Sequence, residues 1–162
     1  MASITFTDSK AWYAGLPTLT GAAAAIITDP TGRVLIVKPN YRDWWSLPGG
    51  ILEHGEPPHV GCAREVLEET GLRVSPGPLL VVDWAPPDEE RPRPFVYFLF
   101  DGGQVAADAD IILQEEELDA YRFASPAEFG GYFPPFLATR YTAALRARAT
   151  GTAIYLPGCG TP

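Results

Sequence analysis

Short apolar runs separated by turn residues predict a series of strands along the first part of the chain. Residues 18–28 and 33–38 flank a turn that contains Pro30 and Gly32, residue types expected in tight turns. The alanines of the first run prefer helix by propensity alone. We predict a strand nevertheless, because the run is short and leads directly into the turn. The second run is continuously apolar over Val34–Val37, so we expect it to be buried on both faces.

A helix is predicted at residues 57–70, since prolines are tolerated in a first turn and Gly71 stands where a C-terminal cap is wanted. The other expected elements are strands at residues 79–84, 95–100, 121–124 and 152–156, and a helix at 134–149. Residues 41–48 read as an aromatic loop with a short strand, and 101–117 as a polar, acid-rich connection. Strands with helices before and after them predict an α/β layered domain.

The length and composition fit one globular domain, which we place at residues 18–157 between an N-terminal extension (1–17) and a C-terminal tail (158–162). No run approaches the roughly 20 apolar residues of a membrane span. Residues 1–10 lack the basic region and apolar core of a secretory signal. The two cysteines, Cys62 and Cys159, form no disulfide framework and no zinc pattern. We therefore expect a reduced, cytoplasmic protein with no membrane partner; a homodimer is compatible with the sequence.

The formal net charge of −8 argues against binding to a nucleic acid polymer, because affinity for a phosphate backbone comes from Lys and Arg. An acidic chain can still bind a small polyphosphate if a metal ion supplies positive charge locally.

Three carboxylates of the predicted helix fall on one side of it. At about 100° per residue, Glu65, Glu68 and Glu69 share an arc of roughly 100°, while Cys62 and Val66 belong to an apolar arc. Like charges at this spacing repel each other by roughly 0.2–0.5 kcal/mol per pair. An isolated Glu-x-x-Glu-Glu is most often a solvated face. Oxygen ligands on one rigid face also suit a hard cation such as Mg²⁺, or Mn²⁺, which would remove the repulsion.

The surrounding residues favour the metal interpretation. Gly50 is followed after five residues by Glu56 and, after seven more, by the run from Arg64 to Leu72 (REVLEETGL). This stretch resembles a complete Nudix box, with apolar residues at both variable hydrophobic positions. The resemblance to the Nudix (MutT-like) hydrolase family implies an α/β/α sandwich with a mixed central sheet and a loop–helix–loop site.

The resemblance also implies roles for individual residues. Glu65 and Glu69 match the principal metal ligands, Glu68 shares a metal or a bound water, and the backbone carbonyl of Gly49 matches a further ligand position. Gly50, Glu56 and Arg64 match residues that shape the site, with Arg64 pairing with Glu56 to fix the loop against the helix.

Hydrolysis of a diphosphate places negative charge on phosphoryl oxygens, which divalent ions neutralise, and needs a base for the attacking water. The base comes either from the helix, as Glu68, or from the connection after the strands. That connection offers Glu115, Glu116 and Glu117, of which Glu116 and Glu117 are the better candidates. We favour a loop glutamate over Glu68, on a segment free to close over the substrate, although a solvated acidic turn explains these residues equally well.

The expected substrate is a small nucleotide-type molecule: a nucleoside triphosphate, a damaged nucleotide, ADP-ribose or a nucleotide sugar. Aromatic rings can stack on a base and cations can meet phosphates. The candidates for these contacts are Lys38, Arg42, Trp44 and Trp84. For Trp45 we expect core packing, and for His54 and His59 a structural or exposed position.

Two competing functions use the same fold. A nucleotide sensor without activity is disfavoured, because degenerate members usually lose box glutamates and this box is intact. Isoprenoid diphosphate isomerase is disfavoured, because its catalytic cysteine lies outside the box helix, whereas Cys62 lies inside it.

Overall fold

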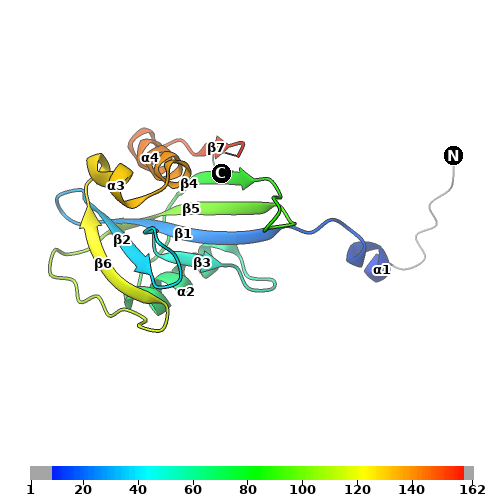
Figure 1. Cartoon of the computed structure of the whole chain (residues 1–162), viewed down its shortest axis with the longest axis horizontal. Coiled ribbons are helices and arrows are strands. Elements are labelled where there is room, and N and C mark those ends of the chain that lie inside the picture. The colour runs from blue at the N-terminus through cyan, green and yellow to red at the C-terminus, as the bar shows by residue number, and fades with distance from the viewer. Residues whose placement is uncertain (1–8, 159–162) are drawn as a thin grey trace.

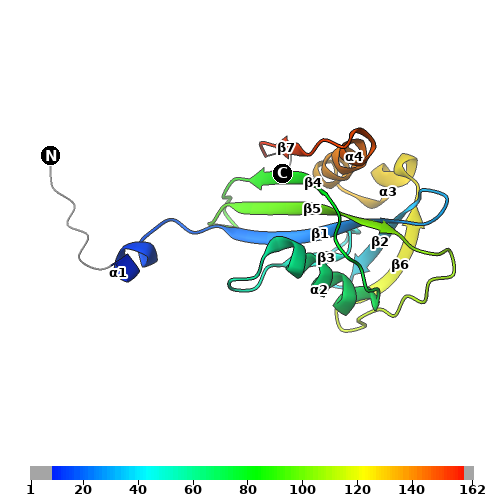
Figure 2. The ribbon, with the colours of Figure 1, turned by 180° about the vertical axis from the view of Figure 1, so that it is seen from behind.

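A seven-stranded mixed sheet runs through the body of the molecule, in a computed structural model that describes residues 9–158 (Figure 1). The strands are β1 (Thr20–Thr28), β2 (Val34–Pro39), β3 (Gly49–Ile51), β4 (Leu79–Ala85), β5 (Phe95–Gln104), β6 (Leu118–Ala124) and β7 (Ile154–Leu156). The helices are α1 (Ser9–Ala14), α2 (Pro58–Thr70), η1 (Pro126–Glu128), α3 (Phe129–Tyr132) and α4 (Pro135–Thr150). Helix α2 covers one face of the sheet and α4 the other (Figures 1 and 2). The expected α/β sandwich with a mixed sheet is confirmed.

The strand order is β6-β2-β1-β5-β4-β7, with β3 paired to β1. One edge of β1 is therefore shared: β2 pairs with it at Thr28, and β3 pairs with it over Ala22–Ala24. The other edge pairs with β5 in parallel. The close approach of β3 depends on Gly49, because a Cβ there would lie 2.3 Å from the carbonyl oxygen of Ala23.

The turn between β1 and β2 is held by the buried carboxylate of Asp29. Its Oδ1 accepts hydrogen bonds from the backbone N–H groups of Thr31 (2.9 Å) and Arg33 (3.0 Å). Burial alone would raise the pKa of Asp29, but the hydrogen bonds from Thr31 and Arg33 lower it to about 2. Asp29 thus satisfies turn donors that would otherwise lack a partner.

Helix α2 has the two faces expected from its sequence. Cys62 and Val66 are fully buried against alanines and Ile27 of β1 and Leu35 of β2. The helix ends at Gly71, which has φ 70° and donates its N–H to the carbonyl of Leu67 at 2.9 Å. Glycine is suited to this left-handed position.

A second core lies between the sheet and α4. It includes Ile26, Ile36 and Leu99 from the strands and Leu137, Tyr141 and Ala144 from the helix. Within it Arg140 donates to Asp83 across 2.6 Å, and the guanidinium lies 3.9 Å from the centre of the Tyr97 ring. The charge of Asp83 is thereby paired inside an otherwise apolar interface.

Several boundaries differ from the predicted ones. Strand β5 continues past residue 100 to Gln104, and β6 begins at Leu118, so the polar connection shrinks to residues 105–117. Glycines at 102 and 103 disfavour a strand by propensity, but pairing between Thr28 and Gln104 extends the ladder. Residues 41–48 form no strand beyond a bridge between Ser46 and Val37. The short helices α1, η1 and α3 were not predicted.

Within residues 9–158, no helix has the length and apolar character needed to cross a membrane. Cys159, one of the two cysteines expected to be reduced, lies outside the described residues; Cys62 is free.

Candidate metal and catalytic site

The acidic face of α2 lies against the backbone of β3. The backbone N–H of Gly49 donates to Oε2 of Glu69 at 2.9 Å. A Cβ on Gly50 would fall 2.5 Å from the carboxyl carbon of Glu65, so the absence of a side chain at Gly50 lets that carboxylate approach the strand. The two glycines thus let the backbone of β3 lie close to the carboxylates of α2.

Arg64 joins the loop before α2 to the helix. Its Nε and Nη2 each lie 2.9 Å from an oxygen of Glu56, and Nη2 also donates to the carbonyl of Ile51 at 3.2 Å. The hydrogen bond from Arg64 is the main reason why the pKa of Glu56 falls to about 2. Nη1 of Arg64 donates in addition to Glu65 at 2.9 Å and to Glu68 at 3.0 Å. The guanidinium therefore contacts both the loop and the acidic face.

Glu69 is the most buried carboxylate of this face, with 7% of its surface exposed. Burial raises its pKa to about 8; the hydrogen bond from Gly49 opposes the rise, and the charges of Glu65 and Glu117 add to it. Burial also raises the pKa of Glu65, with further contributions from Glu68 and Glu117. Carboxyl groups in this position need a proton or a cation to compensate their charge.

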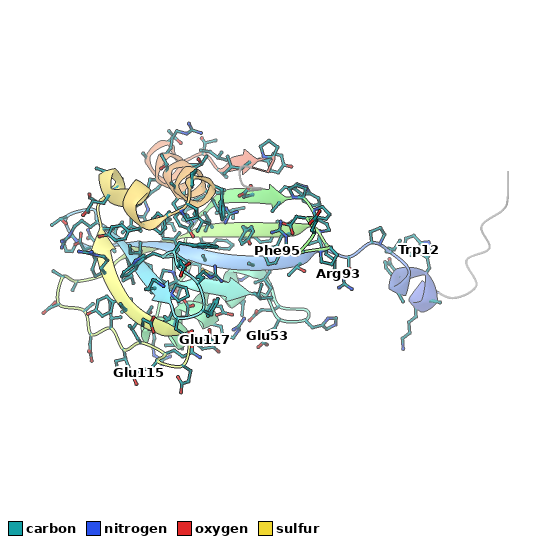
Figure 3. The ribbon with its side chains drawn as sticks, in the orientation of Figure 1. Trp12, Glu53, Arg93, Phe95, Glu115 and Glu117 are labelled. Atoms are coloured by element: carbon teal, nitrogen blue, oxygen red, sulfur yellow. The ribbon has the colours of Figure 1, made fainter. Side chains whose placement is uncertain are left out.

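Glu117 is the connection residue whose charge acts on the acidic face, although all three connection glutamates are exposed. Glu115 and Glu117 can be located in Figure 3 on the segment that leads into β6. The turn is tied to α2, because the N–H of Gln114 donates to the carbonyl of Glu69 at 3.2 Å. Its other end is also hydrogen-bonded, through Asn40, so both ends of the acidic turn have hydrogen-bond partners in this structure.

The donor chemistry of this cluster fits a hard divalent cation, since every side chain offered is a carboxylate. In residues 9–158, no three His, Cys, Asp or Glu side chains already stand in a metal-binding arrangement. These carboxylates have protein partners instead: Arg64 bridges Glu65 and Glu68, and the N–H of Gly49 donates to Glu69. Glu65 and Glu68 would have to exchange the guanidinium for the ion.

The structure brings only three of the four predicted substrate-contact residues to one loop. Nζ of Lys38 donates to the carbonyls of Pro39 and Arg42, so this lysine closes the loop that follows β2. Arg42 lies over the ring of Tyr41, at 4.7 Å from its centre, and its charge opposes the rise in the pKa of Glu69. Trp44 is exposed in the same loop. Trp84, on β4, lies beyond β5 and β1 from that loop and is not brought together with the other three.

Residues that sequence reasoning missed support the site through long-range contacts. The buried hydroxyl of Tyr141 accepts a hydrogen bond from the N–H of Leu47 at 3.4 Å, just before the glycines of β3. Asn40 contacts the acidic turn. Neither has a local sequence signal, because each partner is more than 70 residues away.

Other residues lie where the sequence predicted. Trp45 packs against the core beneath α4, and His54 and His59 are exposed. Burial raises the pKa of the Cys62 thiol to about 12, which makes it a poor nucleophile.

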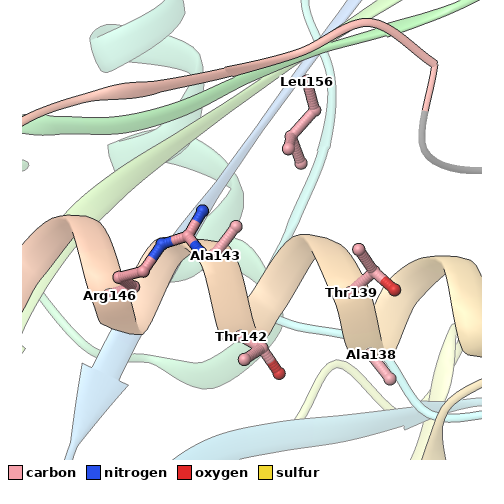
Figure 4. Close-up of a pocket in the computed structure, with 6 residues that line it drawn as sticks. All are labelled: Ala138, Thr139, Thr142, Ala143, Arg146 and Leu156. Atoms are coloured by element: carbon pink, nitrogen blue, oxygen red, sulfur yellow. The ribbon is translucent and has the colours of Figure 1, made fainter.

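A separate hollow of about 380 Å³ lies between α4 and β7 (Figure 4). It contains none of the predicted site residues, and α4 lies on the opposite face of the sheet from α2. Its lining consists of Ala138, Thr139, Thr142, Ala143, Arg146 and Leu156.

A family model and a solved structure each match most of the chain. The family model described as NUDIX domain matches residues 18–146. A MutT protein from Methanosarcina mazei Go1 has a similar structure, with a TM-score of 0.69 and 26% identity over 82% of this chain and 96% of that chain.

Two curated relatives match over shorter stretches. A MutT-like protein from Streptomyces ambofaciens is 45% identical over 53 residues, which is 33% of this chain and 34% of the relative. An ADP-ribose pyrophosphatase from Mycobacterium tuberculosis is 43% identical over 72 residues, which is 41% of this chain and 35% of the relative. The chain therefore spans about a third of the length of these relatives.

Proposed function

The chain belongs to the NUDIX domain family, and on that premise we propose that it is a hydrolase that cleaves the diphosphate linkage of a nucleotide derivative with the aid of a divalent cation. Mg²⁺ is the proposed ion and Mn²⁺ the alternative. The observation that supports this most strongly is the acidic face of α2, where burial and the charges of Glu65 and Glu117 raise the pKa of Glu69 to about 8. Buried carboxylates of this kind are costly for folding unless they take up a proton or a cation.

Glu65 and Glu69 would hold the ion, together with Glu68 and the carbonyl of Gly49. When bound, the ion neutralises charge on the phosphoryl oxygens and lowers the pKa of the attacking water. Glu56 and Arg64 keep the loop and helix together through their paired hydrogen bonds. They shape the site and take no part in the reaction.

Glu117 is the proposed base. Its charge acts on both Glu65 and Glu69, which supports a role for its carboxylate near the proposed ion. It accepts the proton of the water that attacks phosphorus, while the leaving phosphate departs with the electron pair of the broken P–O bond. Glu116 contributes only a backbone contact, through its carbonyl, to the arrangement described.

We propose that the substrate binds over the loop that follows β2. Arg42 is the cation placed to meet a phosphate, since its charge reaches Glu69. Trp44, 39% exposed in the same loop, offers an aromatic surface for a base. Lys38 supports the loop through its backbone contacts, and Trp84 is not part of this proposal.

The substrate class is tested with a panel that contains ADP-ribose, a nucleotide sugar, a nucleoside triphosphate and its oxidised form, each with Mg²⁺ or Mn²⁺. ADP-ribose belongs in it because of the Mycobacterium relative. Hydrolysis should yield products cut at a diphosphate linkage, and the same preparation carrying Glu69→Gln should fall to the background rate. Tight binding without products would instead indicate a nucleotide sensor, and neither binding nor turnover on any compound would contradict the proposal.

A further inference from the structure

Asn40 follows the last residue of β2, where the pairing with β6 is interrupted. Lys38 pairs with Ala120, but Pro39 pairs with Leu118, which leaves Asp119 as the extra residue of a bulge. Beyond the bulge, the backbone N–H of Asn40 donates to the carbonyl of Glu117 at 2.9 Å. The side-chain Nδ2 of Asn40 donates to the carbonyl of Glu116 at 2.8 Å. One residue thus supplies donors to two consecutive carbonyls of the acidic turn.

The start of the acidic turn is held by a different element. The N–H of Gln114 donates to the carbonyl of Glu69, and the N–H groups of Glu117 and Leu118 return to the carbonyl of Gln114 at 3.0 and 2.9 Å. Residues 114–117 are therefore held by hydrogen bonds at both ends, to the last turn of α2 and to Asn40. The turn cannot move outward without losing hydrogen bonds at one of these ends.

These hydrogen bonds act against a repulsive force. Glu115, Glu116 and Glu117 are consecutive and exposed, so their charges repel each other. Repulsion within the turn favours its displacement, which the hydrogen bond from the side chain of Asn40 to the carbonyl of Glu116 resists.

We propose that Asn40 is a positioning residue whose side-chain amide holds the acidic turn against α2 and so fixes the carboxylate of Glu117 at the reacting water. This inference rests on the proposed role of Glu117 as the base. It also links the substrate loop to the base, because Asn40 lies two residues before Arg42.

The test uses Asn40→Ala, which removes the side-chain donor and keeps the backbone N–H, and Asn40→Asp, which keeps the shape and replaces the donor with an acceptor. Loss of one hydrogen bond to a carbonyl should lower kcat by roughly three- to tenfold. KM and the affinity for Mg²⁺, measured by calorimetry, should change by less than about twofold, because the ligands on α2 stay in place. Asp119→Asn, an exposed change in the adjacent bulge, is the matched control and should leave kcat unchanged.

A double-mutant cycle with Glu117→Gln separates the possible outcomes. If Asn40 acts through Glu117, Asn40→Ala lowers kcat in the wild-type background but has no further effect in the Glu117→Gln background. An equal loss in both backgrounds, or no loss in either, overturns the inference. Full activity of Glu117→Gln alone overturns the proposed base and the inference with it. Thermal unfolding of each variant shows whether a lost rate reflects a lost fold.

Discussion

Glu69 combines features that are unfavourable for a carboxylate: it is buried, it is in the last turn of a helix, and it has Glu65 and Glu117 as like-charged neighbours. The helix dipole opposes an anion at that end. The hydrogen bond from the N–H of Gly49 offsets the effect of burial and like charges only in part, since the pKa of Glu69 is still raised to about 8. A residue that costs stability in this way is a strong candidate for a functional role.

Glu69→Gln should abolish most turnover, because it keeps the size of the side chain and removes the charge that binds the cation. A loss on the order of a thousandfold in kcat corresponds to several kcal/mol of transition-state stabilisation. Steady-state rates at saturating Mg²⁺ measure it. Turnover close to the wild-type value would show that Glu69 is not a principal ligand.

The same variant should be folded, and its stability provides the control. A folded-state pKa raised from 4.5 to about 8 means that the unfolded chain releases its proton first, so wild-type stability falls as pH rises through this range. Glu69→Gln has no titrating group at this position, so its stability does not fall with pH for this reason. In excess chelator its free energy of unfolding at pH 8 should equal or exceed that of the wild type, as measured by denaturant titration; a lower value would indicate damage to the fold.

The position of the base is tested by three matched variants, Glu68→Gln, Glu116→Gln and Glu117→Gln, assayed with substrate and Mg²⁺ saturating. We expect Glu117→Gln to lose at least about a hundredfold in kcat, the lower end of the effect of removing a general base. Glu116→Gln should stay within a few-fold, since only its backbone carbonyl is engaged. A collapse of Glu68→Gln alone would place the base on the helix.

Helix α2 and the loop before it form one unit that depends on Arg64. The guanidinium contacts Glu56, Glu65, Glu68 and the carbonyl of Ile51. Lysine carries the same charge but cannot reproduce a planar, paired contact.

Arg64→Lys should therefore lower the free energy of unfolding by about 1–2 kcal/mol and kcat/KM by about tenfold, since charge-assisted hydrogen bonds to Glu56 are lost. Arg73→Lys, an exposed change just past the same helix, is the control and should have no effect on either quantity. Equal behaviour of the two variants in thermal melts and rate assays would show that the Arg64 contacts do not support the site.

Local patterns predicted an element well where characteristic residues mark its two ends. The box helix was expected at residues 57–70 and spans Pro58–Thr70, because a proline start and a glycine end mark it. The extension of β5 was missed, since Gly102 and Gly103 disfavour a strand, and the strand continues through the pairing of Asp101 and Gln104 with β1 on either side of them. The link between Asn40 and the acidic turn was missed because it joins residues 76 positions apart. Lys38 was expected to contact the substrate, and the sequence did not indicate that its amine donates to the nearby carbonyls of Pro39 and Arg42.

At the scale of the whole molecule, the sheet separates two environments. On one face α2 presents Glu65, Glu68 and Glu69, and on the other α4 closes an apolar core with the Asp83–Arg140 pair inside it (Figures 1 and 2). The central strand β1 contacts β2, β3 and β5, so it carries both the core and the backbone against which Glu69 rests. The sheet thus fixes the backbone of β3 against α2, while the side chains of Glu65 and Glu68 would exchange Arg64 for the ion.

We propose that the carboxylates of α2 work by binding a divalent cation. The most direct measurement is the rate of diphosphate hydrolysis in excess EDTA, followed by stepwise addition of Mg²⁺, on the compound that the panel identifies. We predict a fall to the background rate in EDTA and full recovery once the total Mg²⁺ added exceeds the EDTA. Hydrolysis that continues undiminished in excess chelator would contradict the account.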